Sequence, residues 1–184
     1  MKKRSYLVRE IVEVLVLTVC IFLVIHFIIQ SYHIDGVSME PGLNSQELVV
    51  VNKTAYLFHQ PQRGDVIVFH YPVDPRQDFI KRIIGLPGDT IQTNFSQVWV
   101  NGVKLNESAY ISAPANLTAQ KWTVPKNDYF VMGDNRPKSD DSRSWGFVPM
   151  NNIVGKTVVV YWPISDWEFI NTYPSTYTQI SSAH

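Results

Sequence analysis

The longest apolar stretch of the chain runs from Ile11 to Ile29, close to the N-terminus. Only three of its residues are polar or charged, namely Glu13, Thr18 and His26. As an α-helix that rises ~1.5 Å per residue, the stretch would span about 28 Å, which matches a hydrocarbon core of ~30 Å. The pattern therefore predicts a transmembrane helix over residues 11–30.

The flanks of this stretch indicate whether it is retained and how it is oriented. Residues 30–34 read Gln-Ser-Tyr-His-Ile, which lacks the pair of small residues that a signal-peptide cleavage site requires, so we predict an uncleaved anchor. Basic residues cluster before it, at Lys2, Lys3, Arg4 and Arg9. Such an excess marks the cytoplasmic side of a membrane. Residues 1–10 are therefore expected in the cytoplasm, and the chain from residue 31 onward is expected outside it.

The rest of the chain is patterned as short strands. Runs rich in β-branched and aromatic residues alternate with turn signals, at residues 48–51, 66–69, 79–84, 98–100, 103–105, 128–132 and 154–162. The dipeptide Asn101-Gly102 separates two of these runs, and it is a strong hairpin signal. The sequence predicts a mostly β domain over residues 31–170. A flexible tail is expected over residues 171–184, which are rich in Ser, Thr and Tyr.

Composition excludes several classes of function. The chain carries 16 Lys and Arg against 16 Asp and Glu, so it lacks the global basic charge of a nucleic-acid-binding protein. The sole cysteine, Cys20, lies inside the apolar stretch. An internal disulfide, a cysteine-based metal site and a water-exposed catalytic thiol are therefore excluded. We expect neither a metal ion nor another cofactor.

A serine follows the predicted anchor within the stretch Asp35-Gly36-Val37-Ser38-Met39-Glu40-Pro41. Ser38 is either a nucleophile held at the membrane surface or an ordinary polar residue of a linker. A nucleophilic serine needs a base, because its hydroxyl must lose a proton as it attacks. None of the five histidines lies in a recognisable triad context, and no Gly-x-Ser-x-Gly motif is present.

The alternative base is Lys81, within Phe79-Ile80-Lys81-Arg82-Ile83-Ile84. In a strand, alternate residues share a face, so Lys81 would lie between Phe79 and Ile83, and Arg82 would lie on the opposite face. Apolar neighbours disfavour an ammonium ion and lower the pKa of a lysine. A neutral amine is a competent general base, whereas a guanidinium stays protonated. The competing interpretation is an edge strand that carries two cations against unwanted pairing.

A third polar stretch, from Gly133 to Gly146, follows the predicted strand at residues 128–132. By itself it is typical of a solvated loop or of an acidic, calcium-type loop, although it lacks the closing glutamate of a standard calcium loop.

Together these stretches resemble bacterial type I signal peptidases of family S26, and the single anchor with Gly36 resembles the Gram-positive branch. The motifs that carry the resemblance occur in the family's order, from the anchor to about Trp162. They are Gly36-Val37-Ser38-Met39-Glu40-Pro41, Arg63-Gly64-Asp65-Val66, Lys81-Arg82-Ile83-Ile84-Gly85-Leu86-Pro87-Gly88-Asp89, and Gly133-Asp134-Asn135 continuing through Ser139, Asp141, Ser142 and Arg143 to Gly146.

The resemblance implies a mostly antiparallel β domain and a membrane-bound serine endopeptidase that removes signal peptides with a Ser/Lys dyad. Ser38 would be the nucleophile and Lys81 the general base. Ser139 matches a position whose hydroxyl orients the lysine. Four further residues match positions that form supporting charged pairs: Arg82, Asp134, Asp141 and Arg143. Gly36 stands where some members place a serine that assists the oxyanion hole, so backbone N–H groups must supply that hole.

The implied partners are preprotein signal peptides and the lipid bilayer, with proximity to the secretion translocon and no nucleic acid. Two alternatives remain at this point. A self-cleaving regulator of the repressor type would need an Ala-Gly or Cys-Gly scissile pair, and the chain contains neither. A non-enzymatic, anchored β domain would not need both Ser38 and Lys81.

Overall fold

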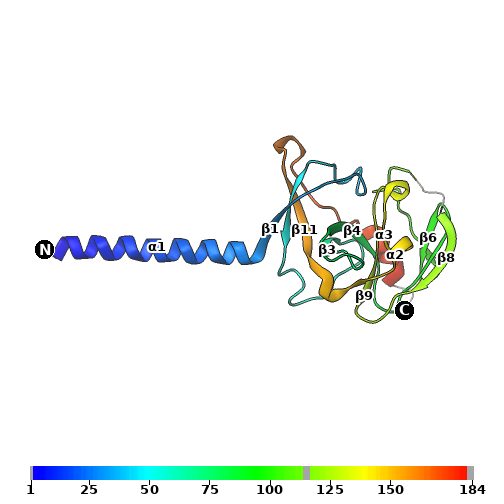
Figure 1. Cartoon of the computed structure of the whole chain (residues 1–184), viewed down its shortest axis with the longest axis horizontal. Helices are drawn as coiled ribbons and strands as arrows, with labels where there is room; N and C mark the ends of the chain where they lie inside the picture. Colours follow the sequence, from blue (N-terminus) through cyan, green and yellow to red (C-terminus); the bar gives the residue numbers. More distant parts are fainter. Residues whose placement is uncertain (1, 114–116, 182–184) are drawn as a thin grey trace.

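The computed structural model describes residues 2–113 and 117–181. A long helix, α1 (Lys2–Ile28), projects from a β-rich domain (Figure 1). Its segment Arg9–Ile28 has a mean hydropathy of 2.8 and no buried residues, as expected for a helix that contacts lipid. The helix ends before the predicted limit of residue 30, because Ile29 and Gln30 already pair with strand β2 as part of strand β1.

Strands dominate the domain, and every strand pair in the described part of the chain is antiparallel. The larger sheet has the order β1-β2-β11-β3-β4-β9-β10, and β12 pairs with β11. Its strands are β1 (Ile29–His33), β2 (Leu48–Asn52), β3 (Val66–His70), β4 (Asp78–Gly85), β9 (Asp128–Met132), β10 (Val148–Pro149), β11 (Ile153–Trp162) and β12 (Glu168–Phe169). The predicted mostly β, antiparallel fold is confirmed.

The smaller sheet has the order β7-β6-β5-β8, with β5 (Thr90–Phe95), β6 (Gln97–Val100), β7 (Val103–Lys104) and β8 (Leu117–Thr123). Residues Asn101 and Gly102 connect β6 to β7, both with positive φ, as the hairpin signal predicts. The short helices are α2 (Ser142–Trp145), α3 (Pro174–Ser181) and the 3₁₀ turns η1 (Arg136–Lys138), η2 (Met150–Asn152) and η3 (Ile164–Asp166).

Strand β4 lies where three clusters of buried side chains meet. Ile80 packs against the cluster that contains Met39 and Leu43. Ile83 belongs to a second cluster with Phe69, and Ile84 belongs to a third, which lines the smaller sheet. Because β4 is surrounded in this way, its two cations, Lys81 and Arg82, are only 4% and 3% exposed. This burial contradicts the edge-strand interpretation of β4, since β3 and β9 pair on its two sides.

The described part of the C-terminal segment is folded, which differs from the flexible tail expected over residues 171–184, of which residues 182–184 lie outside the described part of the chain. Residues 174–181 form helix α3, drawn in red against the β domain (Figure 1). Tyr177 and Ile180 are 5% and 0% exposed and join the core beside the smaller sheet. Polar composition suggested a loose tail, but two apolar side chains spaced on one helical face are enough to bury this helix.

Candidate active site

The side chains of Ser38 and Lys81 meet at the centre of the site. Ser38 lies in the turn that follows β1, whereas Lys81 lies on β4. Lys81 Nζ is 2.7 Å from Ser38 Oγ and 2.9 Å from the carbonyl oxygen of Ile80. Both distances are those of hydrogen bonds. The turn that carries Ser38 is held over β4 because the next residue, Met39, is buried in the core, with only 1% of its surface exposed.

Burial sets the charge state of the Lys81 amine. Desolvation lowers the pKa of Lys81 to about 8, although the nearby carboxylates of Asp141, Asp140 and Asp134 act in the opposite direction. The Phe79 ring, whose centroid is 5.2 Å from Nζ, excludes water on one side, although its face by itself favours the ammonium form. A large share of this amine is therefore neutral at mildly alkaline pH, with a lone pair that can accept a proton.

An open cleft of about 300 Å³ lies beside the two side chains. One part of its lining is apolar, from Ile34, Val37, Val49, Val68, Phe79 and Ile80. Its polar lining comes chiefly from Asp35, Asp78, Lys138 and Asp140, besides Ser38 and Lys81. The cleft lies between the β1 end and β4, so an extended peptide laid along it would pass Ser38 Oγ.

The polar loop from Gly133 to Gly146 closes over the backbone of the Ser38 turn. The Asn135 amide N–H donates to the Ser38 carbonyl at 3.0 Å, and Asn135 Nδ2 donates to the Val37 carbonyl at 3.0 Å. Gly133 permits this approach, since a Cβ there would stand 2.4 Å from the Ser38 carbonyl oxygen. The loop therefore holds the two peptide groups on either side of the Ser38 α-carbon.

Two ion pairs support this loop, formed by the four charged residues that the resemblance singled out. Arg82 binds Asp134 through Nε–Oδ1 and Nη2–Oδ2 contacts of 2.9 and 2.7 Å. Arg143 binds Asp141 at 2.7 Å, and Asp141 also accepts the Gly133 amide N–H at 3.0 Å. Asp134 and Asp141 are 1% and 0% exposed. Removing one partner of such a buried pair would leave an uncompensated charge.

Ser139 is brought to the site but does not contact Lys81 in this structure. Its hydroxyl is buried without a hydrogen-bond partner among the described residues. It lies against Gly133, where an added Cβ would come within 2.3 Å of Ser139 Oγ. The expected orienting bond to the lysine is thus not made here, and the role of Ser139 stays a prediction.

Gly36 lies on the rim of the cleft, two residues before Ser38. Its φ of +111° belongs to a region that L side chains rarely adopt, and no atom lies within 4 Å of the position that a Cβ would take. Glycine is therefore favoured by backbone conformation and not by crowding. In the described part of the chain, no hydrogen bond uses the Ser38 amide N–H.

Several residues of the site escaped prediction as functional residues. Asn135 and Arg136 lie within the loop motif, so their position in the sequence was a usable signal. Arg136 is 3% exposed and forms a double ion pair with Glu107, with one contact of 2.7 Å. Nothing in the polar segment around Glu107 indicated this contact, because it joins residues far apart in the chain.

Comparison with known proteins shows the family of the chain. The profile of the family described as "Signal peptidase, peptidase S26" matches residues 7–162. The chain belongs to the S26 signal peptidase family. It is 40% identical to a signal peptidase I of Leptolyngbya laminosa, over 76% of this chain and 71% of that protein. It is 34% identical to signal peptidase IB of Staphylococcus aureus strain MRSA252, over 92% and 95% of the two chains.

Membership of the S26 family makes the protein a serine endopeptidase. A probable signal peptidase I-1 of Synechocystis is also similar, with 37% identity over 90% of this chain and 88% of that protein. The family match ends at residue 162, so the turn after β11, strand β12 and helix α3 lie beyond it.

Proposed function

We propose that this S26 peptidase is membrane-bound and removes N-terminal signal peptides from exported preproteins, with Ser38 as the nucleophile and Lys81 as the general base. The observation that carries the proposal is the 2.7 Å contact between Lys81 Nζ and Ser38 Oγ, made by a lysine that is 4% exposed. The names of the relatives supply the substrate class, since they are called signal peptidase I or IB.

The proposed reaction begins with the transfer of the Ser38 hydroxyl proton to Lys81. Neutral Lys81 takes the hydroxyl proton while Ser38 Oγ attacks the scissile carbonyl, which gives a tetrahedral intermediate with a negatively charged oxygen. The Ser38 amide N–H is the natural donor to this oxygen. The resulting ammonium of Lys81 then protonates the leaving amine, and the new N-terminus departs. A water molecule, deprotonated in turn by Lys81, hydrolyses the acyl-enzyme and restores both residues.

Substrate binding in this proposal uses main-chain contacts along the cleft. An extended peptide can add as a strand beside β1, or beside the residues of β4 that precede Arg82, which pair with β3 but not with β9, while its alternate side chains enter the apolar part of the cleft.

Membrane attachment is supported by two apolar surfaces. One is α1, which is exposed along its apolar length. The other is the turn between β11 and β12, where Trp162, Ile164, Trp167 and Phe169 are 53%, 74%, 55% and 66% exposed. This turn, in orange, lies at the end of the domain from which α1 projects (Figure 1). Exposed tryptophans of this kind favour the membrane–water interface.

The orientation in the proposal has the N-terminus in the cytoplasm, because of the basic residues that precede the apolar stretch. The β domain then faces the side on which signal peptides emerge from the translocon. Protease added to intact spheroplasts should digest the β domain, and digestion only after lysis would reverse this orientation.

The deciding experiment is cleavage of a purified preprotein by the full-length protein in detergent micelles. Wild type should release the mature protein, whereas Ser38→Ala should not, with unchanged thermal unfolding. Ser96→Ala, which alters an exposed serine between β5 and β6, is the matched control and should cleave like wild type. Turnover by Ser38→Ala comparable to wild type would overturn the assignment of the nucleophile.

A further inference from the structure

We propose that the C-terminal segment Asn171–Ser181 is a positioning element of the active site, which acts through Arg82 and Tyr110 on the loop that holds Ser38. The inference rests on the proposed function, because it assigns the segment a role in the same reaction. The segment lies beyond the part of the chain that matches the S26 family. It therefore adds to the site a contact that the family motifs do not contain.

The segment is seated directly on the turn that precedes β3. An added Cβ at Gly64 would stand 2.0 Å from the Thr172 carbonyl oxygen and 2.9 Å from the Tyr177 ring. Such distances are shorter than any Cβ contact allows, so only glycine leaves room for the segment here. The Gly64 carbonyl in turn accepts a hydrogen bond of 2.8 Å from Arg82 Nη1. Gly64 therefore contacts both the C-terminal segment and Arg82, and it links the position of one to the position of the other.

The first route from the segment to the site runs through Arg82. The same Arg82 Nη1 donates to the Asn171 carbonyl at 2.9 Å. The guanidinium carbon lies 5.1 Å from the centroid of the Tyr173 ring, within the range of a cation–π contact. The remaining guanidinium nitrogens bind Asp134. The C-terminal segment therefore contacts one side of the Arg82 guanidinium and helps to orient it toward Asp134.

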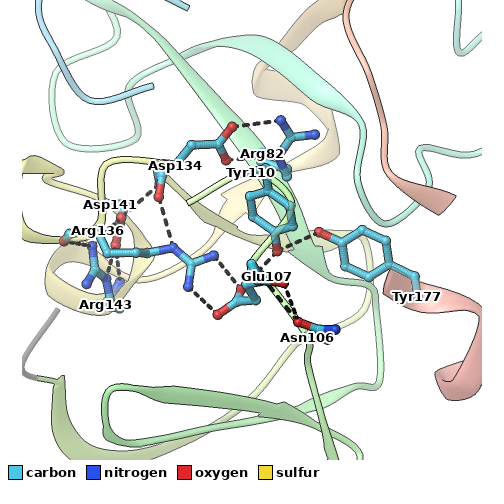
Figure 2. A network of polar contacts seen from close by, with 11 residues as sticks. Arg82, Asn106, Glu107, Tyr110, Asp134, Arg136, Asp141, Arg143 and Tyr177 are labelled. Atoms are coloured by element: carbon cyan, nitrogen blue, oxygen red, sulfur yellow. Dashed lines mark hydrogen bonds and ion pairs between the residues drawn. The ribbon is translucent and has the colours of Figure 1, made fainter. Parts of the chain in front are cut away.

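A second route runs through a chain of buried polar groups (Figure 2). The hydroxyls of Tyr177 and Tyr110 are 3.1 Å apart, and the Tyr110 hydroxyl donates to Glu107 at 2.9 Å. Glu107 forms the double ion pair with Arg136. Arg136 Nε then donates to the Gly133 carbonyl at 3.0 Å.

Both routes end on neighbouring residues of one loop, at Asp134 and at Gly133. The next residue of that loop, Asn135, donates to the Ser38 carbonyl. A shift of a loop held by two buried networks would lengthen or bend hydrogen bonds inside a low-dielectric core, where a weakened bond is costly. The C-terminal segment therefore contributes to the placement of Ser38 Oγ relative to Lys81 Nζ.

The same contacts affect the electrostatic environment of the base. Arg82 neutralises Asp134, which is one of the carboxylates that favour the ammonium form of Lys81. If Arg82 were released, Asp134 would act on Lys81 without compensation. The charged or titratable groups that face Lys81 or line its cleft are Asp134, Asp140, Asp141, Asp35, Asp78, Lys138, His33 and Tyr32. Of these, only Asp134 is bound to Arg82.

The test compares full-length variants of Tyr173 in detergent micelles, with a purified preprotein as substrate. Tyr173→Leu removes one of the two rings that face Arg82, the other being Tyr110 at 4.8 Å. It should lower kcat about tenfold with little change in KM, as expected for loss of a desolvated cation–π contact. The acidic limb of its kcat profile should move to higher pH. Tyr173→Phe keeps the ring and should restore most of the lost turnover. Phe58→Leu, which alters a ring that is 95% exposed and lies outside the segment, is the control and should match wild type.

A purely structural role gives a different result. The inference is overturned if Tyr173→Leu lowers Tm while the kcat and pH profile of the folded protein stay those of wild type. If Tyr173→Leu does not fold, Tyr177→Phe, which removes only the hydroxyl that contacts Tyr110, is measured in the same way and judged by the same criteria. Absence of cleavage by wild type would instead reject the proposed function, so the two failures are separate outcomes.

Discussion

Replacement of Lys81 by methionine tests the central feature of the site, a lysine held in a buried environment. Methionine has a similar length and no charge. Burial lowers the pKa of Lys81 from 10.5 to about 8, a difference of about 2.5, which corresponds to about 3 kcal/mol. The folded protein is destabilised by this amount whenever Lys81 is protonated. Lys81→Met should therefore raise the free energy of unfolding while it abolishes preprotein cleavage.

The sign of the pH dependence follows from proton binding. Between pH 8 and 10.5 the unfolded chain holds a proton on this lysine that the folded chain has lost, so the free energy of unfolding of wild type rises with pH. The advantage of Lys81→Met should therefore be largest below pH 8 and should shrink by about 3 kcal/mol as the pH rises to the unfolded value. Loss of the two hydrogen bonds of Nζ offsets the advantage by roughly 1 kcal/mol each at every pH.

The assay is urea unfolding of the full-length protein in detergent micelles, followed by tryptophan fluorescence at pH 7 and at pH 10.5. The quantity of interest is the difference between variant and wild type at each pH, because the titration of other groups cancels in it. Lys104→Met, which alters an exposed lysine of β7, should show no such pH dependence. A Lys81→Met difference that is the same at both pH values would refute the buried-lysine reasoning.

Three further predictions follow from the same geometry. Lys81→Arg should be nearly inactive because a guanidinium cannot accept the serine proton, whereas Arg82→Lys should retain measurable kcat/KM; equal activity in the two variants would contradict this. Ser139→Ala should lower kcat but leave the free energy of unfolding unchanged or raise it by up to ~1 kcal/mol, since its hydroxyl is buried and unpaired; an unchanged kcat would reject an orienting role. Trp162 and Trp167 should be quenched by brominated lipids in vesicles, and quenching no greater than in plain vesicles would exclude their contact with lipid.

Local sequence pattern was sufficient to predict the features that depend only on the length of an apolar run or on the alternation of side chains along a strand. Apolar length alone predicted α1 from Ile11 to Ile28 but not its first turns from Lys2. The alternation of side chains along a strand correctly separated Lys81 from Arg82. The two cations lie in different environments, one beside Ser38 and the other beside Asp134. Strands β5 and β8 were not predicted, because their exposed faces carry polar residues such as Gln92 and Lys121 and weaken the hydrophobic signal.

The meeting of distant residues was decided only by the tertiary structure. Ser38 and Lys81 are 43 positions apart, and the family motifs could suggest their contact but not its distance or burial. Glu107 reaches Arg136 across 29 positions, with no local pattern that connects them. The C-terminal residues show the same limit, since their polar composition predicted a loose tail. Their burial depends on a space between Gly64 and the smaller sheet that exists only once the whole core has packed.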